Sequence, residues 1–177
     1  MEVYQNPTPE NPAGIANATR YNMPVNSAEE VTSWGAAFGA DYLINKLSLT
    51  GNVSYNELGK IDPNYFNDFN TPKVRFHLGI TRRKIVKNAG FSLNYSWQDS
   101  YLWQSTFASG AVPAFGTLDA QINFKLPLYN SMVKIGGSNL LNKYYYTSYG
   151  NPAVGGMYYV SLIFDKAYDS IMLWPEV

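Results

Sequence analysis

Polar and apolar residues alternate with a period of two along most of the chain. Successive side chains of a β-strand point to opposite faces, so this alternation predicts strands with one apolar and one polar face. In residues 47–55, for example, Leu, Leu, Gly, Val and Tyr alternate with Ser, Thr, Asn and Ser. Seven such strands are predicted, at residues 32–43, 46–57, 73–82, 89–99, 117–126, 131–139 and 157–165.

The connections between these strands alternate strictly between short and long. Short ones lie near residues 44–45, 84–88 and 127–130, and long ones near 58–72, 100–116 and 140–156. In an antiparallel meander this order places every short turn at one end of the sheet. Short periplasmic turns and long extracellular loops are typical of outer-membrane barrels. We therefore predict a transmembrane antiparallel β-barrel with an up-and-down meander, all-β in fold class.

Composition supports a barrel wall. Aromatic residues make up 16% of the chain and charged residues only 15%, and the apolar strand faces, except the weak sixth, carry no charge or side-chain amide. The sequence contains no run of eighteen apolar residues, so it does not indicate a membrane helix. Aromatic residues gather at both strand ends, as in the girdles of barrels. At the long-loop end these are Tyr55, Trp97, Tyr101, Trp103, Tyr144, Tyr145, Tyr146 and Tyr158, and at the short-turn end Tyr42, Phe124, Tyr129 and Phe164.

Charge and residue types argue against several other functions. The net charge is zero, so we expect no nucleic-acid partner. There is no cysteine and one histidine, and no catalytic constellation is found, so neither an enzyme nor a cofactor is expected. Asp62 and Asp68 do not have the spacing of a calcium loop and are interpreted as solvated acids, so no metal site is predicted.

An odd strand count implies missing strands. A seven-stranded meander leaves two open edges, which lipid does not tolerate, and bacterial single-chain barrels have even counts. The chain opens without a signal peptide. We expect residues 1–31 to be an extracellular loop segment, 32–165 to be C-terminal strands of a larger barrel, and 166–177 to be an extension of unclear role.

Residues 136–146, GGSNLLNKYYY, followed by Gly-Asn-Pro at 150–152 and GGMYYVSLIF at 155–164, resemble the end of a TonB-dependent outer-membrane receptor of the Bacteroidetes type. The resemblance implies a 22-stranded barrel around a plug, of which this chain holds the last seven strands, and active uptake of a siderophore, oligosaccharide or similar nutrient. It implies as partners the outer-membrane lipid, the N-terminal barrel and plug, TonB acting through the plug, the barrel-assembly machinery and a small nutrient ligand.

The C-terminus departs from the family pattern. In the family Phe164 would usually be the final residue, whereas here residues 165–177 follow. The resemblance implies that the last strand is the assembly signal, carried by Tyr158, Val160, Leu162 and Phe164.

Two groups of residues are candidates for function. Polar-face residues expected to face the lumen or the plug are Arg75, His77, Asn94, Gln98, Asp119, Gln121 and Lys125. Loop residues expected to bind substrate are Tyr101, Trp103, Gln104, Tyr146 and Tyr149.

Two alternatives remain open at this point. A small passive porin or structural barrel would also alternate apolar and polar residues. A soluble β-sandwich used for binding would do the same, with its apolar face turned inward.

Overall fold

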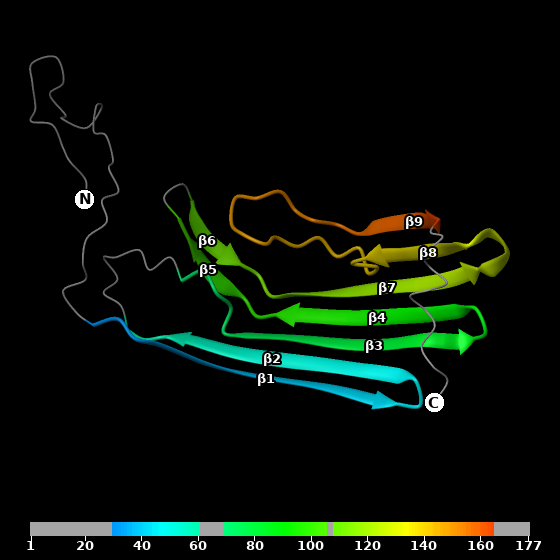
Figure 1. The fold of residues 1–177 in the computed structure, drawn as a ribbon. Coiled ribbons are helices and arrows are strands. Elements are labelled where there is room, and N and C mark those ends of the chain that lie inside the picture. The colour runs from blue at the N-terminus through cyan, green and yellow to red at the C-terminus, as the bar shows by residue number, and fades with distance from the viewer. Residues whose placement is uncertain (1–29, 61–68, 106–107, 165–177) are drawn as a thin grey trace, which may run out of the picture. The chain divides into compact units, whose positions relative to one another are not determined.

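The computed structural model describes residues 30–60, 69–105 and 108–164, and these residues form an all-β fold (Figure 1). Seven strands make one antiparallel sheet in the order β1-β2-β3-β4-β7-β8-β9, which is the predicted meander. A separate two-stranded sheet consists of β5 and β6. The elements are β1 (Ser33–Ile44), β2 (Leu47–Leu58), β3 (Val74–Val86), β4 (Ala89–Gln98), β5 (Tyr101–Gln104), β6 (Ser109–Val112), β7 (Phe115–Leu126), the 3-10 turn η1 (Pro127–Tyr129), β8 (Ser131–Ser138) and β9 (Met157–Phe164).

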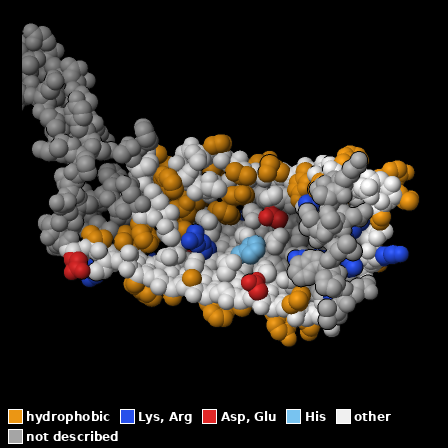
Figure 2. Space-filling model, viewed as in Figure 1, with side chains coloured by type: hydrophobic (Ala, Val, Ile, Leu, Met, Phe, Trp, Pro, Cys, Tyr) orange, Lys and Arg blue, Asp and Glu red, His pale blue; other side chains and the backbone are white. Residues whose placement is uncertain are grey.

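The pairing register brings the predicted apolar faces of all seven strands to one side of the sheet. Directly opposed residues of neighbouring strands point to the same face, so rows of cross-strand partners define that face. One complete row consists of Tyr42, Leu49, Ile80, Leu93, Ala120, Gly137 and Tyr158. Figure 2 shows the other face, where charged side chains lie in the middle and at both ends and hydrophobic ones lie along the margins.

The apolar face of the sheet is exposed. Phe38 is 71% exposed, Leu78 53% and Val160 73%, and the buried hydrophobic residues in the described part of the chain are only Ala89, Val112 and Met132. A β-sandwich buries its apolar faces between two sheets. The observed exposure therefore disagrees with the sandwich alternative and is what lipid-facing strands require.

The three short connections lie at one end of the sheet, as predicted. Asn45 and Lys46 join β1 to β2 with φ of 47° and 67°, and Asn130, with φ of 45°, follows η1 before β8. Asparagine tolerates this left-handed conformation better than most residues.

The connection predicted at residues 84–88 is wrong in extent. β3 continues to Val86, and only residues 87–88 form the turn. Arg82 pairs with Phe91 and Val86 with Ala89, so residues 83–85 bulge opposite the single residue Gly90. A Cβ on Gly90 would lie 2.5 Å from the carbonyl oxygen of Arg83, so the bulge requires glycine there.

The long connection predicted at residues 100–116 is not an unstructured loop. It contains the hairpin of β5 and β6, and β7 begins at Phe115, two residues earlier than predicted. The apolar run of Tyr101, Leu102 and Trp103 is too short to show a strand periodicity in the sequence.

No helix in the described ranges is both long and apolar enough to cross a membrane. The loop predicted at residues 1–31 lies outside the described residues except for its last two, as does the extension predicted at 166–177.

Candidate functional site

The polar face of the sheet carries the residues that the sequence predicted to face the lumen. Arg75 lies opposite Ser54 on β2 and Gln98 on β4. His77, two residues further along β3, lies opposite Ser96 on β4. The Arg75 Nε donates to Ser54 Oγ at 3.1 Å, and His77 Nδ1 lies 2.9 Å from Ser96 Oγ. The alternation of β2, β3 and β4 thus builds a polar patch across three strands.

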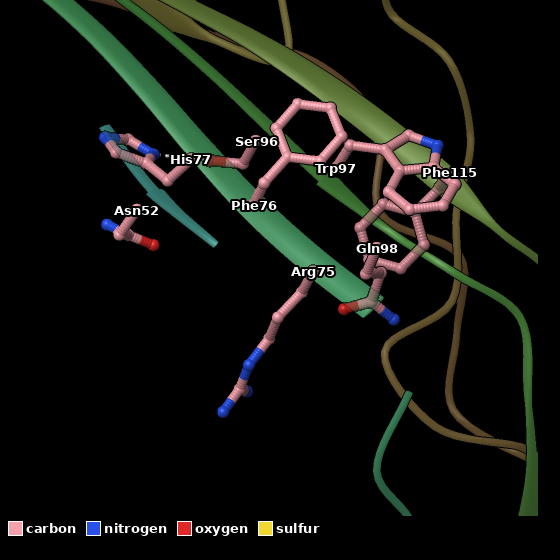
Figure 3. Close-up of a pocket in the computed structure, with 8 residues that line it drawn as sticks. All are labelled: Asn52, Arg75, Phe76, His77, Ser96, Trp97, Gln98 and Phe115. Atoms are coloured by element: carbon pink, nitrogen blue, oxygen red, sulfur yellow. Dashed lines mark hydrogen bonds between the residues drawn. The ribbon is translucent and has the colours of Figure 1, made fainter. Parts of the chain in front are cut away.

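A shallow hollow of about 210 Å³ lies at this patch. Its polar lining comes from Asn52, Arg75, His77, Ser96 and Gln98 (Figure 3). Figure 3 shows the Arg75 guanidinium extending away from the aromatic residues of the neighbouring strands. Among the described residues no carboxylate lies within ion-pair distance of this guanidinium.

Asp119 and Gln121 of β7, by contrast, are bonded within the sheet. Asp119 Oδ1 accepts hydrogen bonds from Ser138 Oγ at 3.0 Å and from the Asn139 backbone N at 2.7 Å. Gln121 Oε1 accepts from Tyr159 Oη at 2.8 Å. These two residues, which were predicted to face the lumen or the plug, stabilise the junction of β7, β8 and β9.

The remaining residues predicted to face the lumen or the plug, Asn94 and Lys125, also lie on the polar face. Asn94 pairs with Gly79 and Asp119, and Lys125 pairs with Met132. The Lys125 backbone N also donates to Asn88 O at 2.8 Å. The register therefore brings to the polar face all seven residues predicted to face the lumen or the plug, and their local partners differ.

The asparagines of the motif after β8 form the turn that begins the last long loop. Asn139, only 1% exposed, donates from Nδ2 to Lys143 O at 2.9 Å and accepts from Lys143 N at 3.3 Å. Asn142 Oδ1 accepts from Gly156 N at 2.8 Å, which ties the start of the loop to its end. Both have left-handed φ, 49° and 47°. The described contacts explain the motif as a structural turn.

The hairpin of β5 and β6 is held by the two other long loops. Asn70, ahead of β3, donates from Nδ2 to Gln104 O at 2.8 Å and accepts from Gln104 N at 2.7 Å. Tyr101 Oη donates to Thr147 O in the β8–β9 loop at 2.8 Å. Three segments distant in sequence therefore meet at the long-loop end of the sheet.

Aromatic contacts reinforce this loop cluster. Phe115 and Tyr145 stack with ring centroids 4.2 Å apart. The Tyr149 ring lies so close to Gly110 that a Cβ there would be 2.5 Å from Tyr149 Cδ2. A second hollow of about 410 Å³ lies beside the cluster, with a polar lining that includes Asn70, Lys73, Asp99 and Tyr101.

The loop residues predicted to bind substrate differ in placement. Tyr101, Gln104 and Tyr149 belong to the loop cluster and make the contacts described above. Trp103 lies near Tyr101, with ring centroids 6.5 Å apart. Tyr146 is 45% exposed on the β8–β9 loop. Burial raises the pKa of Tyr101 above its ordinary value, so this phenol remains a neutral donor at physiological pH.

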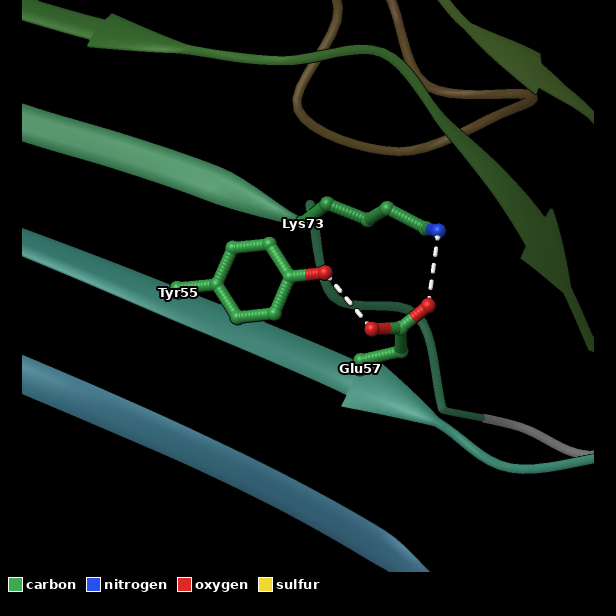
Figure 4. Close-up of polar contacts among 3 residues, drawn as sticks. All are labelled: Tyr55, Glu57 and Lys73. Carbon is green, nitrogen blue, oxygen red and sulfur yellow. Dashed lines mark hydrogen bonds and ion pairs between the residues drawn. The ribbon is translucent and has the colours of Figure 1, made fainter.

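A further polar group at the long-loop end was missed in the sequence. Glu57 Oε2 accepts from Tyr55 Oη at 2.6 Å, and its Oε1 pairs with Lys73 Nζ at 3.1 Å (Figure 4). The hydrogen bond to Glu57 raises the pKa of Lys73. Glu57 follows Tyr55 by two positions in one strand, a spacing that could have indicated a shared face.

Sequence reasoning also missed Asn70, Asn139 and Asn142 as the residues that fix the loops. Their positive φ and their distant partners follow from the tertiary structure. Asparagine next to Thr-Pro at 71–72 was the available signal for a turn at Asn70.

The last strand presents on the exposed apolar face the residues that the resemblance predicts to be an assembly signal. Tyr158, Val160, Leu162 and Phe164 are each more than half exposed. Among the described residues β9 pairs with β8 alone. The described chain brings no three His, Cys, Asp or Glu side chains together in an arrangement that could hold a metal ion.

No protein-family model matches the sequence, and no curated protein matches it. Solved structures do match its fold. The FrpB iron transporter from Neisseria meningitidis, in its F3-3 variant, superposes with a TM-score of 0.58 at 18% identity over 75% of this chain. The siderophore receptor PiuA from Acinetobacter baumannii gives 0.54 at 16% identity over 75%. The ferric citrate transporter FecA, in its unliganded form, gives 0.51 at 20% identity over 67%.

The chain spans only a small part of these proteins, 23% of FrpB, 20% of PiuA and 21% of FecA. Both the strand order and the exposed apolar face agree with a piece of a barrel wall. The chain therefore has the fold of a β-barrel wall segment, which it shares with part of these solved structures.

Proposed function

We propose that residues 1–177 form the last strands of a bacterial outer-membrane receptor that takes up a nutrient actively, with energy from TonB delivered through a plug. The observation that carries the proposal is the exposed, aligned apolar face of all seven strands. A plug and the preceding strands would occupy the polar side and the open edges.

The height of the apolar face matches a bilayer. Along β2 this face is bounded by two charges, Arg82, which lies opposite Leu47, and Glu57, which lies two positions beyond Tyr55. Leu47 and Glu57 are ten positions apart, 57 − 47. Ten residues at about 3.3 Å each span roughly 33 Å, and a strand tilt near 40° reduces this to about 25 Å, the apolar height of outer-membrane barrels.

The edges of the described sheet argue against a barrel closed by these seven strands alone. In a seven-stranded meander β1 and β9 run in the same direction (Figure 1). Closing the sheet on itself would need one parallel pair among antiparallel ones. Additional strands that pair antiparallel with β1 and β9 satisfy both edges without it.

The substrate class that we propose first is a ferric siderophore, because the matched structures are described as transporting iron or ferric citrate, or as a siderophore receptor. Aromatic and amide side chains near the loop cluster, including Trp103 and Tyr146, would contact it. Such side chains also suit oligosaccharides, which the test must therefore include.

Cell fractionation and uptake measurements test the proposal. Antibodies against residues 139–156 should detect a heat-modifiable protein in the outer membrane that is much larger than 19.8 kDa. Producing cells should take up a labelled ferric siderophore or oligosaccharide, and a protonophore should stop this uptake. Uptake that continues with the protonophore would identify a passive porin, and antigen found only in the soluble fraction would exclude a membrane role.

A further inference from the structure

Five cationic side chains gather at the short-turn end of β1, β2, β3 and β4. Lys46 lies in the β1–β2 turn, Arg82, Arg83 and Lys84 lie in the last part of β3, and Lys87 lies in the β3–β4 turn. All five are exposed. Figure 2 shows Lys and Arg side chains gathered at this end of the sheet.

These cations have no acidic neighbours in their own hairpin. The β3–β4 hairpin, residues 74–98, contains no Asp or Glu. In the β1–β2 hairpin the acid nearest to the turn is Asp41, which pairs with Thr50 on the polar face, whereas Arg82 pairs with Leu47 on the apolar face. Among the described residues the cluster forms no ion pair, so it presents a net positive surface.

Arg82 connects this surface to the apolar face. Its cross-strand neighbours are Leu47 and Phe91, and it follows Leu78 and Ile80 in the apolar column of β3. An arginine at the margin of a lipid-facing surface extends its aliphatic stem along that surface and places its guanidinium at the level of the headgroups. The observed register thus places Arg82 at the short-turn margin of the apolar face.

The bulge of β3 places more charge at the same level. Residues 83–85 bulge opposite Gly90, just beyond the row that contains Arg82. A bulge twists a strand and redirects its side chains. Arg83 and Lys84 therefore extend the cationic surface beyond the apolar face, at the depth where headgroups lie.

We infer that the short-turn end binds the phosphate headgroups of anionic phospholipids, with Arg82 as the contact on the lipid side. This inference rests on the proposed function, because it requires the apolar face to lie in a bilayer. The partner is a lipid because the cationic surface continues the lipid-facing surface. Each cation near an anionic membrane surface strengthens association about fivefold.

The test uses the whole protein that carries residues 1–177, reconstituted into vesicles of phosphatidylcholine alone or mixed with phosphatidylglycerol. The lipids that remain bound after gentle detergent extraction are quantified by mass spectrometry. The test variant is Arg82→Gln/Arg83→Gln/Lys84→Gln. Its matched control, Lys60→Gln/Lys73→Gln/Lys143→Gln, removes equal charge at the long-loop end.

The expected result is enrichment of phosphatidylglycerol over phosphatidylcholine in wild type and control, and at least a tenfold smaller enrichment in the test variant. High salt should reduce the enrichment by screening. Equal enrichment in test variant and wild type, with a normal heat-modifiable barrel, would overturn the inference and leave the proposed function intact. Failure of the wild type to enter either kind of vesicle would reject the proposed function itself.

Discussion

Among the described residues every non-glycine residue with positive φ is an asparagine except Lys46. Asparagine enters the left-handed region at low cost, and its side chain bonds nearby backbone. Asn70, Asn139 and Asn142 each combine this conformation with side-chain hydrogen bonds. Asparagine is therefore a structural residue of the turns and loops in this chain.

Replacing Asn139 by glycine should separate these two contributions. Glycine keeps the left-handed backbone and removes both side-chain bonds to Lys143. We expect a loss of about 1–3 kcal/mol in the free energy of unfolding, measured by urea titration in lipid vesicles. Asn45→Gly is the matched control, because Asn45 is exposed with a similar φ. Equal effects of the two changes would contradict the role assigned to the Asn139 side chain.

A side chain at position 136 should destabilise the sheet, because the Tyr159 side chain passes over Gly136 to donate its hydrogen bond to Gln121. A Cβ on Gly136 would lie 2.7 Å from Tyr159 Oη and 2.8 Å from the Ala120 carbonyl oxygen. Gly136→Ala should cost about 1–3 kcal/mol of unfolding free energy in the same titration. Gly39→Ala, also on the polar face, should cost less, since its nearest atom would be 3.6 Å away. An unchanged unfolding free energy in Gly136→Ala would show that the position of Tyr159 does not depend on the absence of a side chain at residue 136.

At the scale of elements, the β5–β6 hairpin depends on partners from two other loops. Asn70 bonds the Gln104 backbone, and Thr147 accepts from Tyr101. A hairpin of two four-residue strands is only marginally stable in water by itself. The contacts within the loop cluster therefore supply stability that the hairpin lacks by itself.

Removing the Tyr101 hydroxyl should loosen this cluster. In Tyr101→Phe we expect amide exchange in β5 to accelerate about two- to tenfold, the effect of one lost hydrogen bond. Hydrogen exchange followed by mass spectrometry measures this rate. Tyr146→Phe, on an exposed ring, should leave it unchanged. Unchanged exchange in both variants would show that Tyr101 does not hold the hairpin.

The same contact should depend on pH at the alkaline side. The pKa of Tyr101 is raised in the folded protein, so the unfolded hairpin loses its phenolic proton first. Stability is then complete below the ordinary tyrosine pKa and falls as pH rises above it. As pH rises into the alkaline range, amide exchange in β5 of the wild type should therefore increase more than the intrinsic amide rate does. In Tyr101→Phe this additional increase should be absent. An identical pH profile in both proteins would refute this linkage.

At the scale of the whole molecule, the described strands have an exposed apolar face in place of a hydrophobic core. Leu78 and its neighbours are exposed, as the proposed contact with lipid requires. The polar face carries the hydrogen-bonded side chains, including His77 with Ser96. The two faces should therefore respond oppositely to added charge.

An arginine on the apolar face tests this difference. Leu78→Arg should cost about 2–4 kcal/mol, as an arginine facing the middle of a bilayer does. Asn94→Arg lies on the adjoining strand but on the polar face, and it should cost much less. Urea titration in vesicles measures both. Similar losses for the two variants would show that the apolar face does not contact lipid.

The sequence alone determined the seven strands, their faces and the order of short and long connections. Alternation is a local property, since each side chain is driven to lipid or water by its own polarity. The predicted bounds therefore agree with β1, β2, β4, β8 and β9 within a residue. The polar-face residues were predictable for the same reason.

Only the tertiary structure decided the bulge opposite Gly90, the hairpin of β5 and β6, and the partners of Asn70, Glu57 and Tyr159. Each of these joins residues that are distant in sequence or on different strands, so no local pattern encodes it. The gathering of Arg82 with Lys46 belongs to the same class, since it depends on which hairpins are neighbours. Periodicity fixes where a side chain points, whereas the register of the sheet fixes what it meets.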